Sequence, residues 1–282
     1  MNETDFSHTH LPTIGKRVLR LGVASNYGLD TAGVHHAAER GVNFWFWSPR
    51  HKRMTPALKE ILARDRDRHV VAAITALGLS ARGVRSYVDK TRKLLGIDQL
   101  DLVLLSWLGR TSRFSPAIQE ELVRLRDQGA VRAVGTSIHD RVRAGELARD
   151  SVLDALMIRY NAAHPGAEQD IFPHLEKRKP LLISYTTTCW RQLLKPLKGI
   201  EMEPWPGPSP AGASIPPLTP ELCYRFVLGS PHLHVALTAP ANRTQLDQNL
   251  DVLNAGPLSG AEDAWVRQYG RQVRARKKIP FI

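Results

Sequence analysis

The sequence predicts an α/β fold, a (β/α)8 TIM barrel in which eight parallel strands and their helices close into one domain. Short apolar runs rich in β-branched residues alternate with amphipathic segments along the 282 residues. An open doubly wound sheet would require a glycine-rich phosphate loop after its first strand, but SNYGLD stands there, and no G-x-G-x-x-G or P-loop occurs. We therefore expect a single barrel over residues 1–282.

The expected strands have the length of strands that are covered on both faces. In chain order they are residues 18–24, 42–47, 70–75, 100–107, 131–137, 153–160, 181–185 and 234–238.

Apolar spacing and capping residues mark the helices between these strands. Residues 84–95 carry apolar side chains at helical spacing, and Gly96 stands where a helix-ending glycine is common. Ser115 followed by Pro116 is typical of a helix start, and Gly129 ends that helix. Another apolar stripe is formed by Leu246, Leu250 and Leu253.

Three segments fall outside the alternation of strands and helices. We expect residues 1–17 to form an N-terminal extension or hairpin, and residues 259–282 to form an extra helix and a tail. Residues 186–217 are rich in proline and too long for a plain connection; such loops are usually lids or binding loops. Because they follow the seventh strand, we expect them to sit over the barrel mouth, where the active sites of such barrels lie.

The chain is strongly basic, with a formal charge of +12. The runs at 64–68 (RDRDR) and 176–179 (EKRK) are short and contain acids, and only 271–278 (RQVRARKK) is a dense basic stretch. Nucleic-acid-binding proteins concentrate cations on one face and add aromatic side chains for stacking. We therefore expect no nucleic-acid partner and attribute the charge mainly to solvated helix faces.

Composition argues against several other classes. Cys189 and Cys223 form no C-x-x-C motif, which excludes a disulfide framework, a zinc ribbon and a redox dithiol. The opening MNETDFSHTH has no apolar core, so we expect no signal peptide and a cytoplasmic location. No apolar run approaches the roughly 20 residues that span a bilayer. The expected partner is a small-molecule ligand or substrate, and the expected state is a monomer or weak oligomer.

Several segments, in barrel order, resemble the aldo-keto reductases, in a bacterial-type branch. These segments are AAERGVNFWF, LLGIDQLDLVLLSW, LVRLRDQGAVRAVGTS, MIRYNAAHPGAE, LLISY and LTAPANRTQLDQNLDVL. The resemblance implies NADP(H) at the barrel mouth and carbonyl reduction by an Asp-Tyr-Lys-His tetrad, in which the tyrosine donates the proton.

The tetrad positions implied by the resemblance carry other residues here. Phe46 stands in the place of the Asp, His51 in that of the Tyr, Thr75 (within one residue) in that of the Lys, and Ser106 in that of the His. The mechanism needs an acid whose pKa is lowered by a neighbouring cation, and phenylalanine and threonine do not supply that field. We expect the standard tetrad chemistry to be lost. The candidate catalytic residues are then His51, Thr75 and Ser106, with His51 as the proton donor.

The cofactor positions implied by the resemblance are kept in part. Tyr185 would stack on the nicotinamide, and Ser137 matches the serine of the family's G-S-N motif, although Ile138 replaces the asparagine. Met157 replaces a glutamine, whereas Asn161 of the Tyr-Asn pair is kept.

In the last loop, Asn249 matches an adenine-contacting asparagine, while Gln248 replaces its acidic neighbour. Arg243 or Gln245 could approach a 2′-phosphate near the start of the last barrel helix. NADP therefore stays a candidate cofactor.

Three functions stay open at this point. The first is an NADP(H)-binding oxidoreductase that acts on an unknown carbonyl or related small molecule with an altered proton donor. The others are a catalytically inactive ligand-binding or regulatory barrel and a non-redox enzyme using the same mouth. A metal site is not expected, because His51 lies across the barrel from His139 and His164. Trp45 and Trp107 are expected to pack beneath the surrounding helices.

Overall fold

The computed structural model describes residues 5–24, 28–109, 114–207 and 215–276. Eight parallel strands form a closed barrel in the order β10-β3-β4-β5-β6-β7-β8-β9, which confirms the predicted (β/α)8 barrel. The barrel strands are β3 Leu21–Ala24, β4 Phe44–Trp47, β5 Val70–Ile74, β6 Leu100–Leu108, β7 Val131–Ile138, β8 Ala155–Arg159, β9 Leu181–Tyr185 and β10 Val235–Thr238.

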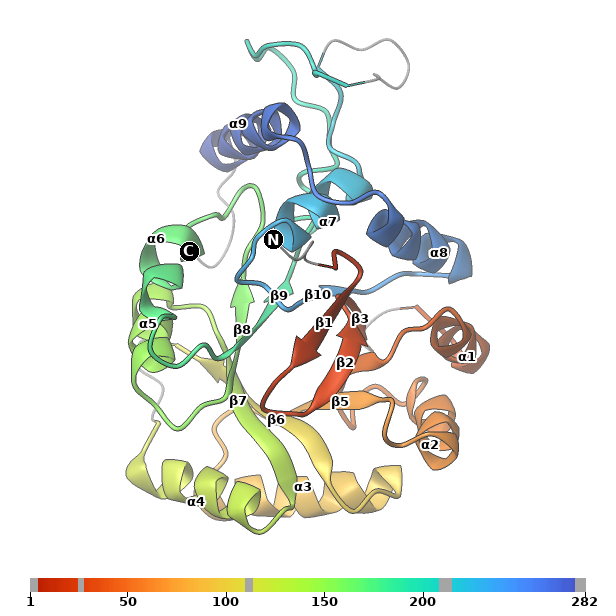
Figure 1. Ribbon diagram of the computed structural model, residues 1–282, viewed down its shortest axis with the longest axis vertical. Coiled ribbons are helices and arrows are strands. Elements are labelled where there is room, and N and C mark those ends of the chain that lie inside the picture. Colours follow the sequence, from red (N-terminus) through yellow and green to blue (C-terminus); the bar gives the residue numbers. More distant parts are fainter. Residues whose placement is uncertain (1–4, 25–27, 110–113, 208–214, 277–282) are drawn as a thin grey trace.

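Helices surround the barrel on its outside (Figure 1). The predicted caps are present: the Ser115 side chain accepts the Ile118 N–H, and Gly96 has a φ of 69°. The helices are α1 Thr31–Glu39, α2 Thr55–Arg64, α3 Ala81–Leu95, α4 Pro116–Asp127, α5 Arg141–Arg149, α6 Ala167–Asp170, α7 Pro220–Leu228, α8 Arg243–Asp251 and α9 Gly260–Arg276, with short 3-10 turns η1 Phe172–His174 and η3 Val252–Asn254.

The predicted strand 18–24 is in fact two strands, which is a correction. Strand β2 (Lys16–Leu19) pairs antiparallel with β1 (His8–Leu11), and β3 begins after Arg20. Arg20 breaks the run because its guanidinium donates to the Leu233 carbonyl at 2.7 Å and its backbone N–H bonds the Ser7 carbonyl at 2.9 Å. The hairpin β1–β2 lies across the N-terminal end of the barrel, with Leu11 and Val18 buried among the barrel-interior side chains (Figure 1).

Strand alternation divides the core into a barrel interior and a layer beneath the helices. Phe46 and Ile74 belong to the interior, near the C-terminal ends of their strands. Trp45 and Trp47 point outward and are fully buried beneath the helices, as expected for Trp45. Tryptophans at the end of β4 therefore support the helix layer and do not line the mouth.

The N-terminal end of the barrel is closed by a buried ion pair. Asp101 is fully buried, and Lys16 Nζ lies 2.9 Å from its Oδ1. The Arg66 guanidinium and the Val71 N–H donate to Asp101 Oδ2 at 2.8 and 2.9 Å. Arg66, from the basic run 64–68, is therefore used at the end opposite the mouth.

The long segment after β9 sits at the mouth only where it begins. Farther on, it packs along α9: Tyr269 donates to the Lys195 carbonyl at 2.7 Å, and Trp265 Nε1 donates to the Glu203 carbonyl at 2.8 Å. In Figure 1 it extends past α9, away from the strands. The expectation that all of 186–217 covers the mouth is corrected accordingly, and residues 208–214 lie outside the described part.

The extra helix expected from residue 259 is present as α9, and its apolar positions are buried. Within the described ranges, no helix has the length and apolar character needed to cross a membrane.

Candidate functional site at the barrel mouth

Three polar side chains meet at the C-terminal ends of neighbouring strands. Arg159 ends β8 and pairs in register with Tyr185, which ends β9. His139 follows β7 directly, and its Nε2 lies 2.6 Å from the Tyr185 hydroxyl. Side chains alternate along β8, and Met157 belongs to the barrel interior, so Arg159 also points inward. The mouth thus holds a hydrogen-bonded Tyr–His pair beside a cation.

The electrostatics of this group leave Arg159 as its charged member at neutral pH. Burial, helped by the charge of Arg159, lowers the pKa of His139 from 6.5 to about 4. Burial raises the pKa of the Tyr185 phenol well above 10, with the charge of Arg159 acting in the opposite direction. The Tyr–His pair is therefore neutral, while the guanidinium of Arg159, 7% exposed, keeps its charge.

Two half-exposed tryptophans border the group. The Trp107 ring lies 5.0 Å from the His139 ring at an interplanar angle of 42°, and it is 41% exposed. The expectation that Trp107 packs beneath helices is wrong. A φ of 40° at Trp107, next to the register shift in β6, accompanies this placement. Trp190, also 41% exposed, has the Arg159 guanidinium 5.8 Å from its ring centroid.

The backbone beside Trp190 is in an unusual conformation. Cys189, Trp190 and Arg191 have φ values of 51°, 50° and 65°, in the left-handed region that non-glycine residues rarely adopt. Thr186, just before them, has a φ of 56°. Left-handed residues cost of order 1 kcal/mol or more each and cluster at functional sites. The strain lies where the chain leaves β9 and enters the mouth.

Asn161, fully buried, holds this segment in place. Its Nδ2 donates to the Thr186 carbonyl at 2.8 Å, and its Oδ1 accepts from the Ala163 and His164 N–H groups at 3.1 and 3.0 Å. The side-chain atoms expected to contact a cofactor are thus used within the chain. Asn161 as a cofactor ligand stays a prediction.

The structure brings together two of the three predicted catalytic residues. The Thr75 hydroxyl accepts the Ser106 N–H at 3.0 Å and donates to the Ala76 carbonyl at 2.9 Å. The side chain of Thr75 thus joins the ends of β5 and β6, while the interior position at the end of β5 belongs to Ile74. His51 lies after β4, where its N–H bonds the Ser48 carbonyl, and burial with the charge of Arg50 lowers its pKa.

The predicted cofactor residues lie around the same rim. Ser137 is inward in β7 and 6% exposed, and its hydroxyl makes no hydrogen bond to other described residues. Asn249 donates to Thr238 Oγ1 at 2.9 Å and joins α8 to β10. Gln245 accepts the Ala241 N–H at 2.9 Å, and its own N–H donates to the N-cap side chain of Asn242 at the start of α8, where Arg243 is exposed.

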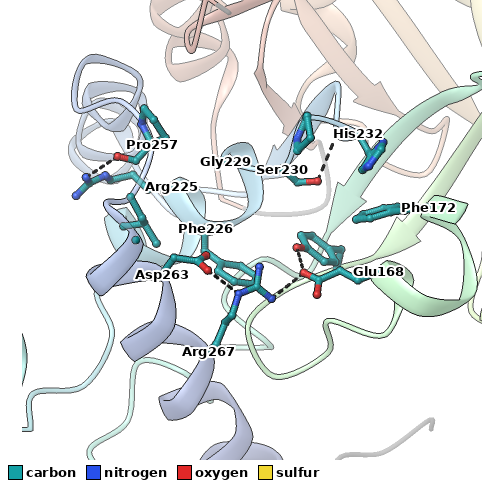
Figure 2. A pocket seen from close by; sticks show the side chains of 14 residues that line it. Glu168, Phe172, Arg225, Phe226, Gly229, Ser230, His232, Pro257, Asp263 and Arg267 are labelled. Atoms are coloured by element: carbon teal, nitrogen blue, oxygen red, sulfur yellow. Dashed lines mark hydrogen bonds and ion pairs between the residues drawn. The ribbon is translucent and has the colours of Figure 1, made fainter. Parts of the chain in front are cut away.

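A separate pocket of about 440 Å³ lies outside the barrel, between α7, α9 and the α6 region (Figure 2). Arg267 crosses it, bonded to Glu168 at 2.8 Å and to Asp263 at 2.6 Å, with Phe226 below its guanidinium. The Tyr160 hydroxyl donates to Glu168 at 2.6 Å. These mutual bonds anchor α9 to the barrel. Among the described residues, no three His, Cys, Asp or Glu side chains converge as a metal site.

The model of the Aldo/keto reductase family matches residues 22–189, which run from the first barrel strand to the strained segment after β9. The chain belongs to the aldo/keto reductase family.

Relatives of this aldo/keto reductase are distant. It is 25% identical over 215 residues to the NADH-specific methylglyoxal reductase of Escherichia coli (strain K12), covering 67% of this chain and 65% of that protein, slightly less than two thirds of its length. An aldo-keto reductase from Bacillus halodurans in its holo form has a similar fold, with a TM-score of 0.75, 18% identity and coverage of 95% and 96% of the two chains. The glycerol dehydrogenase of Gluconobacter oxydans gives a TM-score of 0.74 at 17% identity, covering 99% of each chain.

The Tyr185–His139 bond and the contact of Arg159 with Trp190 were not predicted from the sequence of this aldo/keto reductase. Each residue follows or ends a strand, so its place at the mouth was predictable. Their mutual contacts depend on side-chain direction and on a left-handed turn at residues without a glycine signal.

Proposed function

We propose that the protein is an NADP(H)-binding oxidoreductase of aldo-keto reductase type, which reduces a small carbonyl compound without the Asp-Tyr-Lys-His tetrad. The observation that carries the proposal is the placement of Tyr185. Tyr185 is the last residue of β9, at the mouth, and its hydroxyl oxygen lies 2.6 Å from His139 Nε2, which fixes the ring. A tyrosine fixed at its far end offers a rigid face for stacking on a nicotinamide ring.

The residues around Tyr185 suit a nicotinamide dinucleotide. Ser137 supplies a hydroxyl that bonds to no other described residue, and Arg159 and Arg243 supply positive charge for phosphate groups. When bound, the cofactor supplies the reducing equivalent. The protein's part is to hold the ring against Tyr185 and the phosphates at the rim. The NADH-specific relative makes NADH the first cofactor to compare with NADPH.

In this proposal, the proton is supplied by His51. Since burial and Arg50 lower its pKa below 6.5, His51 is mostly neutral at neutral pH. Reduction should therefore become faster as the pH falls toward the pKa of His51. Thr75 keeps β5 and β6 in register through the Ser106 N–H, so its role in the reaction is to position the strand ends.

Titration of the purified protein with NADPH and NADH by calorimetry tests the proposal. We expect saturable binding that is weakened about tenfold or more in Tyr185→Ala, because the stacking face is lost. Tyr185→Phe keeps the face and removes the bond to His139, so it should bind with intermediate affinity. Tyr87→Phe, on α3 and hydrogen-bonded to the Ile74 carbonyl, is the matched control. Absence of binding at millimolar cofactor would refute the proposal.

A ligand-binding barrel without redox activity is favoured by one specific observation. Phe46 and Ile74, both interior residues at the ends of β4 and β5, place apolar side chains where the resemblance implies an aspartate and, within one residue, a lysine. A protein that binds NADPH but transfers no deuterium from labelled cofactor to a panel of small carbonyls, starting with methylglyoxal, would support this second function. Transfer that is lost in His51→Ala would support the first.

A further inference from the structure

We propose that Arg159, together with Trp190 and the Tyr185–His139 pair, forms a subsite for an oxyanion, a carboxylate or phosphate group of the ligand. This inference rests on the mouth being the ligand site, as proposed above, and it names the chemistry of the group bound there. A substrate carboxylate and a cofactor phosphate share this chemistry.

The first observation behind this inference is the position of Arg159. The side chain enters the barrel mouth from the end of β8, level with Tyr185, and is 7% exposed. A guanidinium stays charged inside a protein and presents a planar fork of donors that matches carboxylate and phosphate oxygens. An apolar residue could stand at this strand end, since Met157, two residues earlier on the same inward face of β8, is apolar. A buried fork at this depth suits a ligand oxyanion.

The second step is the way Arg159 is oriented. Trp190 places its ring 5.8 Å from the guanidinium carbon, within the range of a cation–π contact. Trp190 is the middle one of three consecutive left-handed residues, a costly conformation that clusters at functional sites. Asn161 fixes the start of the turn through the Thr186 carbonyl at 2.8 Å. The strained turn thus aligns the fork.

The third step is the charge around the subsite. His139 and Tyr185 are neutral next to Arg159, and their bond adds no negative charge to the mouth. Burial lowers the pKa of Arg159, as do the positive charges of Arg141 and Arg274, and Arg141 is also bonded to Asp170 at 2.6 Å. The positive charge at the subsite is that of Arg159 itself, and it favours an anionic group over a neutral one.

The test measures binding of small oxyanions without cofactor. Wild-type protein is titrated with glyoxylate and with inorganic phosphate, followed by calorimetry and by tryptophan fluorescence, since Trp107 and Trp190 border the subsite. We expect millimolar or tighter binding of at least one anion. Arg159→Met should weaken it tenfold or more, and Arg159→Lys should restore part of it. Arg149→Met, exposed at the far end of α5, should bind like the wild type.

Folding and local geometry are checked separately by NMR titration of His139. Of the charged and titratable groups on adjacent strands, Arg159 and Tyr185 face this ring. Removing the cation in Arg159→Met should raise the pKa of His139, and so should anion binding to the wild type. An unfolded variant would instead show the His139 pKa of a free histidine together with loss of the circular dichroism signal.

The outcomes separate this inference from the proposed function. If Arg159→Met loses glyoxylate but keeps NADPH, the oxyanion belongs to the substrate; if it loses NADPH and phosphate, it belongs to the cofactor. If NADPH does not bind but an anion binds through Arg159, the proposed function fails and the subsite stands. If no anion binds the wild type, or if folded Arg159→Met binds as tightly, the subsite is refuted.

Discussion

Asn161→Ala should destabilise the fold and the mouth together. In the wild type, this side chain bonds the Ala163 N–H, the His164 N–H and the Thr186 carbonyl from a fully buried position. Alanine replaces none of these bonds. Because Thr186 opens the turn that carries Trp190, the substitution also releases the aromatic contact of Arg159.

The size of the loss follows from what each partner keeps. The Ala163 N–H is left buried without an acceptor, which costs about 1–3 kcal/mol. The His164 N–H retains the Asn161 carbonyl, and the Thr186 carbonyl retains the Cys189 N–H, so each lost bond costs about 0.5–1.5 kcal/mol. The sum is about 2–6 kcal/mol.

Urea unfolding followed by circular dichroism measures this loss, together with NADPH titration of the folded variant. Asn254→Ala, exposed in η3, is the matched control and should change the free energy of unfolding by less than about 0.5 kcal/mol. An Asn161→Ala protein with wild-type stability and weakened NADPH binding would contradict the reasoning, because it would make Asn161 a cofactor ligand.

Two further predictions concern stability. Asp101→Asn leaves Lys16 and Arg66 facing a neutral amide at the buried end of the barrel, and should lower the free energy of unfolding in urea by about 3–5 kcal/mol. The exposed control Asp98→Asn should lower it by less than about 0.5 kcal/mol. Equal effects of the two substitutions would refute the role of the ion pair. Burial and the charge of Arg159 lower the pKa of His164 from 6.5 to about 4. As the pH falls, His164 is therefore protonated in the unfolded chain before it is protonated in the folded protein. The free energy of unfolding, which is highest above pH 6.5, should fall as the pH drops toward 4. A urea midpoint that stays constant over that range would contradict this. The other histidines shifted to about 4 are His69, His139 and His234.

Much of the fold could be predicted from the sequence because the strands are buried on both faces. Each run is nearly all apolar, and Gly96 and Ser115 are in the predicted caps. The run 18–24 was misread because apolar content continues through Arg20, whose long-range bonds to the Leu233 carbonyl end the strand. A contact between residues so far apart in sequence leaves no local pattern.

The candidate site was predictable as a location more than as a set of contacts. Tyr185 ends β9 and Ser137 is the second-last residue of β7, so both lie at the end of the barrel where the site was expected. Trp107 was assigned to the layer beneath the helices because tryptophans usually pack there, yet its left-handed backbone turns it onto His139. Neither the register shift in β6 nor the turn at Trp190 has a glycine that would mark it in the sequence.

The central claim is that the face of Tyr185 holds a nicotinamide ring. It is tested most directly by NMR on deuterated protein in which only tyrosine rings carry protons, in the presence of NADPH. Saturating those ring protons should transfer magnetisation to the nicotinamide protons in the wild type, and the transfer should vanish in Tyr185→Phe with deuterated phenylalanine. Bound NADPH that shows no transfer, or the same transfer in the variant, would contradict the account.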